Sequence, residues 1–580
     1  MNRMLAQAFK SSIFSIAFIG LICPAMAQLT PAQQQAIDVQ TGTASPGRDV
    51  RSQQDKFLPR VEPRVEVQKL QIQSAPLGAE GIIFELKNIV LSGVSVYPES
   101  ILGAVYADKV ETIISLADLY DIASTLSRKY RNDGYILTQV VVPPQTIEDG
   151  VARLQVIEGT IDTIEIRGSH EPSMDLVRNY ATRIKIKNAL NTNDLERALL
   201  LINDLPGISA RGILNPSPTK AGAADLIIII ERKAYDAQIG IDNHGTRYLG
   251  PVQLSAYGST NSALGQNERI TAQFVNAGIE ERFHELLYGA LTYEQPVWTY
   301  GSTVTLGFRH TNTNPGFNLK QFDVEGWSTN MSAEFMHPFI RSRARNLNGR
   351  IRFDHNNITT KNNIPVDPTR KDRVRALRLG GTLETIDHFL GVGYNILDAE
   401  FSKGLGILGA NNEGDLDMSR PAADPSFEKM TAEIQRLQRV TSEVNLLLAT
   451  KGQISNKALL SSEEFGVGGL EYGRGYDSSE IIGERGLSGK VELQWNEPHK
   501  FSILDDYQLY SFYDAGTVWN EDATTSAEKR DTITSAGLGI RADFSKTTTA
   551  GFMLAFPLNR EPQTDNNKSP RVYINLYHRF

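Results

Sequence analysis

One stretch of the chain combines residue types that could carry specific chemistry: FGVGGLEYGRGYDSSEIIGERGL, residues 465–487. Arg474 stands there between Gly473 and Gly475, and Tyr476 follows. The planar arginine side chain can donate two parallel hydrogen bonds in a geometry that lysine cannot match, and flanking glycines allow a tight turn. From these residues alone, an exposed glycine-rich hairpin with a solvated arginine is the preferred interpretation.

Other candidates for chemistry are weak. The nine histidines show no H-E-x-x-H motif and no pair at metal-ligand spacing beside a carboxylate cluster. Neither G-x-S-x-G nor the phosphate-binding G-x-x-x-x-G-K-[ST] motif occurs. The carboxylate pairs Glu280-Glu281 and Glu463-Glu464 fall in predicted turns, where a solvated surface is the preferred interpretation. We therefore predict no catalytic residue, no metal site and no cofactor.

The first residues have the pattern of a secretory signal peptide, which we assign to residues 1–27. Basic residues flank an apolar run, and a small-x-small cleavage pattern ends at Ala27, so the mature chain is expected to start near Gln28. A lipoprotein signal at Cys23 is an alternative, but the preceding Ile22 stands where a small residue is required. Because Cys23 is the only cysteine, the exported product has no thiol, which fits a bacterial envelope protein.

Composition narrows the class further. The formal net charge of -8 argues against generic nucleic-acid binding. No stretch after the signal peptide approaches the roughly 18 to 20 uninterrupted apolar residues of a membrane helix. The mature protein is therefore either soluble or a membrane barrel, whose alternating strands a hydropathy average does not detect.

Two modules that contain helices follow a segment rich in Gln, Pro and Arg at residues 28–76. Each module, at residues 77–159 and 160–234, reads as a strand, helices and two further strands. The main helix of the first module begins with an S-x-x-D capping box formed by Ser115 and Asp118. We expect two tandem α+β modules, each a small sheet backed by helices.

Alternation replaces helical periodicity over residues 235–580. In the last segment, for example, Val572, Ile574 and Leu576 share one parity, and the chain ends on the aromatic Phe580. A secreted β-sandwich or solenoid also alternates in this way. The length of the region and its terminal amphipathic strand favour an outer-membrane barrel of about sixteen antiparallel strands.

Together these parts resemble the outer-membrane transporters of two-partner secretion, the TpsB family of hemolysin secretion/activation and filamentous-adhesin exporters. The modules resemble POTRA (polypeptide-transport-associated) domains, and the resemblance covers nearly the whole mature chain. Its most specific parts are four stretches: GYILTQVVVPPQTIEDGVARLQVIEG at 134–159, INDLPGI at 202–208, FGVGGLEYGRGY at 465–476 and FYDAG at 512–516.

The resemblance changes the interpretation of Arg474. In the family, the loop after the eleventh strand folds back into the barrel, and the arginine at its tip pairs with an aspartate on the inner wall; the motif match assigns this aspartate to Asp514. The sequence departs mildly from the family tetrad V-R-G-Y/F, because Gly473 replaces the valine. The residues assigned to this lock between loop and barrel are Gly473, Arg474, Gly475, Tyr476, Asp514 and Gly516.

The resemblance also implies a function. It implies a non-enzymatic transporter, with POTRA domains in the periplasm, that moves an unfolded secreted partner such as an adhesin or cytolysin through its barrel to the cell surface, embedded in outer-membrane lipid as a monomer. A factor that assembles other barrels is the alternative within the superfamily, and a passive porin is a third hypothesis. The porin hypothesis explains neither the modules nor the G-R-G-Y stretch.

The second module is the expected site of partner capture, by strand addition to a sheet edge beside an apolar groove. The candidate contact residues lie on its helix and on the strand DLIIIIERK, and the alternative is that they form the core: Leu195, Leu199, Ile202, Ile227 and Ile229. The segment LTPAQQQAIDVQ, with Thr30 as N-cap and Pro31 at the first helical position, is the expected plug helix inside the barrel.

Overall fold

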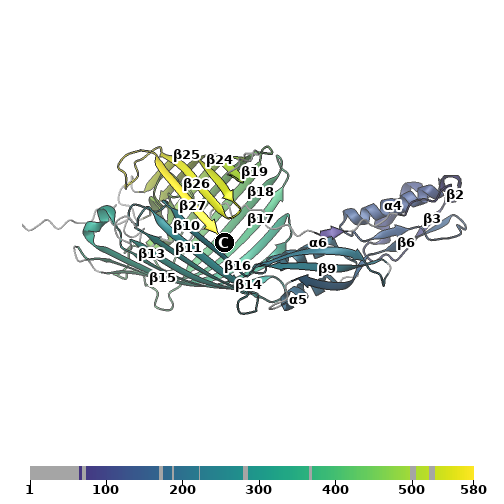
Figure 1. Ribbon diagram of the computed structural model, residues 1–580, viewed down its shortest axis with the longest axis horizontal. Helices are drawn as coiled ribbons and strands as arrows, with labels where there is room; N and C mark the ends of the chain where they lie inside the picture. The colour runs from purple at the N-terminus through teal and green to yellow at the C-terminus, as the bar shows by residue number, and fades with distance from the viewer. Residues whose placement is uncertain are drawn as a thin grey trace, which may run out of the picture.

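The computed structural model shows an elongated molecule, with a β-barrel at one end and two small domains in a row beyond it (Figure 1). It describes residues 65–67, 73–168, 174–185, 189–220, 222–278, 285–364, 369–496, 504–521 and 529–580. The expected signal peptide, the expected plug helix and the pair Glu280-Glu281 lie outside these ranges. Among the described helices, none is long and apolar enough to cross a membrane.

The first domain contains two small sheets packed on one long helix. Strands β3, β6 and β5 form one sheet in the order β3-β6-β5, and β2 pairs with β4. The elements are β2 Ile83–Leu86, β3 Asn88–Ser92, α3 Glu99–Gly103, β4 Thr112–Ser115, α4 Leu116–Asn132, β5 Gln139–Val141 and β6 Val151–Ile157. The predicted capping box at the start of α4 is present, and hydrogen bonds from the Ser115 backbone and hydroxyl lower the pKa of Asp118.

The second domain is a four-stranded sheet covered by two helices. Its elements are β7 Thr160–Gly168, α5 Asp175–Lys185, α6 Thr192–Asn203, β8 Ile208–Pro216 and β9 Ala223–Arg232. The strand order is β1-β8-β9-β7, and β1 is Val65–Val67, from the segment expected to be only a linker. It pairs with β8 in parallel, with Val65 opposite Gly212 and Val67 opposite Leu214. The linker therefore supplies a strand to this domain.

Sixteen antiparallel strands close the barrel, as predicted. They are β10 Tyr235–Asp242, β11 Gln253–Asn261, β12 Arg269–Ala277, β13 Leu286–Val297, β14 Ser302–Thr313, β15 Val324–Arg341, β16 Arg345–Asn362, β17 Arg370–Asp387, β18 Gly393–Gly404, β19 Glu428–Arg439, β20 Val444–Ser455, β23 Arg485–Asn496, β24 Asp506–Trp519, β25 Arg530–Ser545, β26 Thr548–Pro557 and β27 Arg571–Arg579. The first and last strands, β10 and β27, lie side by side and complete the ring (Figure 1).

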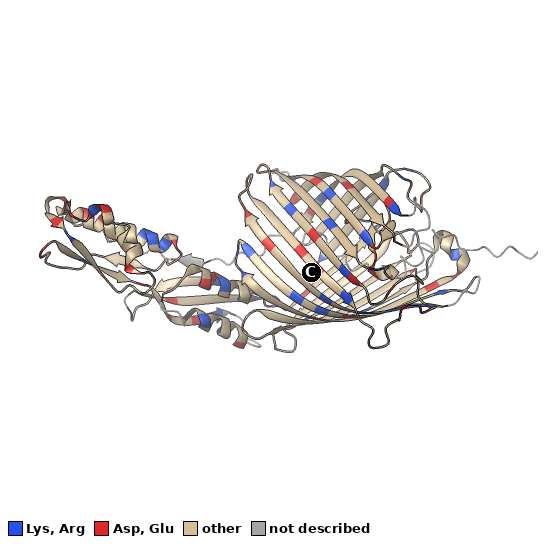
Figure 2. Ribbon diagram, turned by 180° about the vertical axis from the view of Figure 1, so that it is seen from behind, with Lys and Arg blue, Asp and Glu red and all other residues tan. Residues whose placement is uncertain are grey.

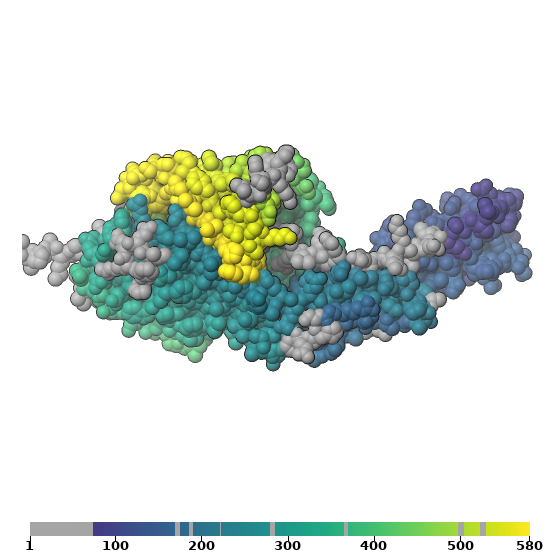
Figure 3. Space-filling view, viewed as in Figure 1, coloured from purple at the N-terminus to yellow at the C-terminus, as the bar shows by residue number. Residues whose placement is uncertain are grey.

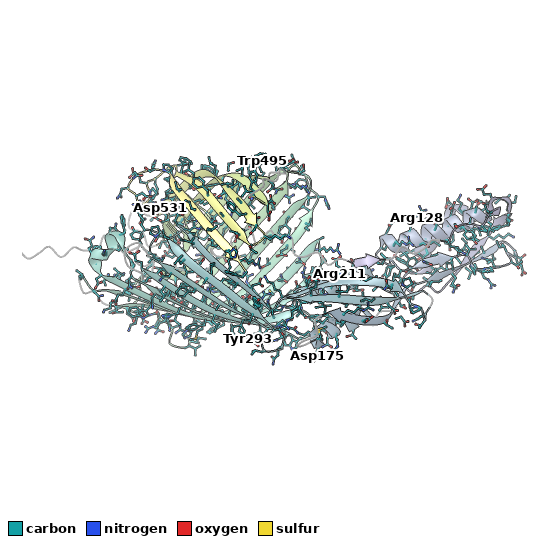
Figure 4. The ribbon with its side chains drawn as sticks, viewed as in Figure 1. Arg128, Asp175, Arg211, Tyr293, Trp495 and Asp531 are labelled. Atoms are coloured by element: carbon teal, nitrogen blue, oxygen red, sulfur yellow. The ribbon has the colours of Figure 1, made fainter. Side chains whose placement is uncertain are left out.

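The side chains of the strands alternate between lipid and lumen. In β27, Val572, Ile574 and Leu576 are exposed on the outer surface, whereas Tyr577 donates a hydrogen bond of 3.0 Å to Asp242 of β10. Because β10 continues directly from the second domain, odd strands of the ring run away from the domains and even strands run back. Figure 4 labels Asp531 at the far end of β25 and Trp495 at the near end of β23.

The second domain contacts two barrel turns. Arg341 at the end of β15 donates two hydrogen bonds of 2.7 Å to the carboxylate of Asp204, which follows α6. Arg183 of α5 lies 4.0 Å from the centre of the Tyr300 ring, in the turn between β13 and β14. In the space-filling view the second domain lies directly against one end of the barrel (Figure 3).

We predict that the Arg341–Asp204 pair fixes the orientation of the second domain. Arg341→Gln should broaden the distance distribution between spin labels at Lys220→Cys and Leu390→Cys, because the substitution removes a bidentate, largely buried contact. Electron paramagnetic resonance on the reconstituted protein measures this distance. Arg343→Gln is the control, since Arg343 makes a more exposed pair with Glu196 beside the same joint. An equally narrow distribution in Arg341→Gln would contradict the prediction.

Candidate functional site: a loop folded into the barrel

The loop between β20 and β23, residues 456–484, lies inside the barrel and carries its own small sheet. Its strands are β21 Phe465–Val467 and β22 Ile481–Gly483, which pair with each other. A hydrophobic cluster joins the loop to the wall: Ala449, Phe465, Val467, Tyr472, Tyr476, Ile481, Val518 and Ile533. This loop follows the eleventh strand of the ring, and the exposed hairpin that the residues alone suggested is excluded by its burial.

Arg474 and Asp514 form a bidentate ion pair inside the barrel. Nε of Arg474 donates to Oδ2 of Asp514 at 2.9 Å, and Nη2 donates to Oδ1 at 2.7 Å. The backbone N–H groups of Gly473 and Arg474 also donate to Oδ2, at 3.3 and 3.0 Å. Arg474 is 4% exposed and Asp514 is fully buried. The carboxylate therefore accepts four hydrogen bonds from the tip of the loop.

The glycines of the motif allow the tip to approach the wall. Gly473 has φ +120°, where a side chain would be strained, so the valine of the family pattern would not fit this conformation. A Cβ at Gly475 would lie 2.8 Å from the backbone nitrogen of Pro557, and one at Gly516 would lie 2.3 Å from a methyl group of Val467. Glycine at position 473, where the family pattern has valine, is thus the residue that suits this backbone conformation.

Tyr476 and Asp477 attach the loop to the end of the barrel that lies away from the two small domains. The Tyr476 hydroxyl lies 3.1 Å from Oδ1 of Asn559, which follows β26. Asp477 accepts hydrogen bonds from Thr564 at 2.5 Å and from Arg571 at 2.9 Å. These contacts connect the loop to the outer connection between β26 and β27.

Two charged residues of the site escaped the sequence analysis. Glu492 of β23 contacts Nη1 of Arg474 and also accepts a hydrogen bond of 2.8 Å from Arg541 of β25. The guanidinium of Arg474 lies 3.5 Å from the centre of the Phe512 ring. Glu492 and Arg541 occupy alternating strand positions that face the lumen, and this alternation is the signal that could have identified them. Only the pairing register between the barrel strands brings the two residues together at Arg474.

The part of the loop that follows β20 also forms ion pairs, and here the expectation that Glu463-Glu464 lies on a solvated surface was wrong. Glu463 is buried, not solvated, and pairs with Arg378 of β17 at 2.8 Å and with Lys429 of β19 at 2.7 Å. The neighbouring Glu464 pairs with Arg420 at 2.5 Å. The physical reason is that the turn containing both glutamates folds into the lumen, where arginine and lysine side chains compensate their charge.

Further ion pairs cover the lumen wall away from the loop. Arg350 of β16 pairs with Asp398 at 2.6 Å and with Glu400 at 3.1 Å, both in β18. Ile351, on the opposite parity, is exposed on the outer surface. Acidic and basic residues are interleaved across the barrel strands in Figure 2. The lumen wall thus presents both signs of charge.

The residues expected to capture a partner belong to the second domain, outside the barrel. Leu195, Leu199 and Ile202 of α6 are fully buried in the core of the second domain, so their side chains are not an open groove. Ile227 and Ile229 are half-buried on β9, which lies between β8 and β7. The expectation that β9 presents a free edge is wrong, because both of its sides are paired. The edges of this sheet are β1 and β7.

Ion pairs characterise the lumen site, and no catalytic arrangement is recognisable among the residues that the structure describes. Within the described ranges, no group of three or more His, Cys, Asp or Glu side chains is placed to hold a metal ion. The site consists instead of paired charges that attach a loop to two walls of a pore.

Comparison with known proteins places these features in one family. The model of the haemolysin secretion/activation protein ShlB/FhaC/HecB family matches residues 226–542, and that of the ShlB-type POTRA domain matches residues 84–159. The heme/hemopexin transporter protein HuxB of Haemophilus influenzae (strain 86-028NP) is 22% identical over 472 residues, which cover 80% of this chain and 82% of HuxB.

Other relatives in the same comparison are the outer membrane transporters CdiB. CdiB of Escherichia coli O6:K15:H31 (strain 536 / UPEC) is 23% identical over 569 residues, 92% of each chain. The solved structure of CdiB from Escherichia coli superposes with a TM-score of 0.72 at 19% identity and covers 96% of this chain and all of CdiB. Since the family model spans more than half of the sequence, this chain belongs to the haemolysin secretion/activation protein ShlB/FhaC/HecB family of two-partner secretion transporters in the outer membrane.

Proposed function

We propose that the Arg474–Asp514 pair holds the loop inside the pore of this transporter in one conformation, from which an unfolded secreted partner can displace it during secretion. The buried bidentate pair is the observation that supports this proposal. The loop fills space that a polypeptide must cross, and its polar anchors can exchange their partners for water or for a passing chain. No catalytic step is needed, because each stage is binding or release.

The sheet edge of the second domain supports a mechanism of capture. The pairing of β1 with β8 shows that this edge accepts an extended segment by main-chain hydrogen bonds. We propose that an extended segment of the partner competes with residues 65–67 for the same edge of β8. The buried residues Leu195, Leu199 and Ile202 then support the sheet from behind, and Ile227 and Ile229 lie on its other face.

The partner is proposed to be a secreted exoprotein, because the matching family is described as haemolysin secretion/activation proteins. All sixteen strands of the barrel come from one chain, which supports a monomer as the working unit. We also propose that residues 29–42 form a plug helix that occupies the pore at rest.

Loss of the Arg474–Asp514 pair should impair secretion of the partner without preventing assembly of the barrel. Arg474→Ala leaves Asp514 and Glu492 without a cation that both contact, a cost of about 3 to 5 kcal/mol for a broken buried pair. The barrel rests on its own strand pairing, so we expect a heat-modifiable barrel in the outer membrane at normal levels. Without the pair the loop leaves the conformation from which the partner can displace it, so secretion of the partner should fall at least tenfold in an immunoblot of culture supernatant. Asp514→Ala should give the same result, and the double variant little more.

The matched control for the lock is Arg309→Ala. Arg309 lies on the lumen side of β14 and donates to Asn330 at 3.0 Å, away from the loop. Its replacement should leave secretion near the wild-type level. Normal secretion from Arg474→Ala would refute the role of the lock.

Capture can be tested with a reversible tether between β1 and β8. Glu66 lies opposite Ile213, so Glu66→Cys with Ile213→Cys should allow a disulfide that holds β1 on the edge. We expect binding of the partner's N-terminal domain in a pull-down to fall at least fivefold under oxidising conditions and to recover with reductant. The mature chain is expected to have no native cysteine that could interfere.

A second tether controls for rigidity of the domain. Thr160→Cys with Ala223→Cys joins β7 to β9 at residues that are opposite in register, and leaves the β8 edge unaffected. Binding should persist in this variant. Full binding with β1 tethered would place capture on another surface.

Closure by the expected plug helix predicts a conductance change. Removing residues 29–42 should raise single-channel conductance in planar bilayers, because the segment would no longer occupy the pore. Equal conductance would mean that the segment does not plug the barrel.

A further inference from the structure

A cavity of about 800 Å³ lies on the outer wall of the barrel, not in its lumen. Its floor is formed by outward-facing residues of β19, β20 and β23: Met430, Ala432, Ile434, Thr450, Gly452, Ile454 and Leu487. Met430, Ile454 and Leu487 are each about half exposed on this surface. An apolar hollow in this position opens into the hydrocarbon region of the membrane.

Small residues create the hollow between larger neighbours. Ala432 of β19 is opposite Gly452 of β20, and Gly452 is opposite Leu487 of β23. A Cβ at Gly452 would have no heavy atom closer than 3.5 Å, so the glycine leaves open space. The volume is within the range of about 300–1,000 Å³ typical of small-ligand sites.

Polar and basic residues line the mouth of the same cavity. Strand β20 runs away from the domains, so its end at Ser455 and the start of β23 lie in the outer leaflet. Arg485, Asn520, Glu521 and Lys529 line the cavity there. Arg485 pairs with Glu521 at 3.0 Å, both side chains are about half exposed, and Lys529 is exposed beside them. The mouth therefore has a net positive charge above an apolar floor.

Trp519 lies at the boundary between the apolar floor and the basic mouth of the cavity. It lines the cavity at the end of β24, and the guanidinium of Arg530 lies 5.7 Å from the centre of its ring. Tryptophan at this depth is typical of the interface between hydrocarbon and headgroups. The ligand that fits has an apolar chain for the floor and an anionic group for the mouth.

We propose that this cavity is a specific site for a phosphorylated lipid of the outer leaflet, with an acyl chain between Ala432 and Leu487 and a phosphate group near Arg485 and Lys529. The basic residues at the mouth distinguish it from the apolar floor of the same cavity. This site is independent of the lock inside the pore, and it adds a defined lipid partner to the outer-membrane location.

Native mass spectrometry of the full transporter tests the site. The protein in detergent is mixed with bis-phosphorylated lipid A, with its dephosphorylated form, or with phosphatidylethanolamine. We expect the bis-phosphorylated form to remain bound at least fivefold more than either of the others. Gly452→Leu, which fills the hollow, should remove most of this binding, and Arg485→Gln with Lys529→Gln should remove the preference for phosphate.

Two controls separate the site from general lipid contact. Gly258→Leu places a leucine on β11, where a Cβ meets open space, and Lys568→Gln removes a basic residue from another outer loop; both should bind as the wild type does. Heat modifiability checks that every variant is folded. Equal retention of all three lipids, or undiminished binding by folded Gly452→Leu, would overturn the proposal.

Discussion

The closed hydrogen-bond ladder of the barrel is the constraint on which the rest of the structure depends. In a membrane, each backbone N–H and C=O group needs a partner within the protein, so the sixteen strands must form a ring without edges. The ring is completed where β10 pairs with β27, from Gln238 opposite Arg579 to Asp242 opposite Asn575. Closure then fixes the parity of every strand, and with it the side chains that enter the lumen.

A ring of this size encloses more space than its own side chains fill, since barrels of about sixteen strands leave an aqueous channel. The loop at residues 456–484 occupies that space and is attached to two separate parts of the wall, through Arg474 to β24 and through Glu463 to β17 and β19. Both attachments are ion pairs. An intact buried pair adds little net stability relative to apolar packing, but either charge alone is costly, so the loop is held in a defined position that water or a polar chain can release.

Sequence patterns predicted the barrel and its strand number, because alternation is a local signal, whereas the Arg474–Asp514 pair was implied only by the resemblance to the transporter family. Patterns could not predict Glu492 with Arg541 or Glu463 with Arg378, since those pairs depend on the register between strands distant in sequence. The free edge assigned to β9 was wrong for a related reason: strand order within a sheet is a long-range property. The helix residues Leu195 and Ile202 have the spacing of a core face, and burial in the domain agrees with that simpler interpretation.

Alternation along β20 also connects the two faces of the wall. Gly452 and Ile454 point outward into the cavity that faces lipid, whereas Gln453 between them points inward. The side-chain nitrogen of Gln453 donates to the backbone oxygens of Glu463 and Glu484, at 3.0 and 3.2 Å, one at each stem of the loop. The strand that shapes the outer cavity is therefore the strand that holds the loop stems inside. A lipid bound in that cavity would stabilise the wall at the place where the loop enters and leaves the pore.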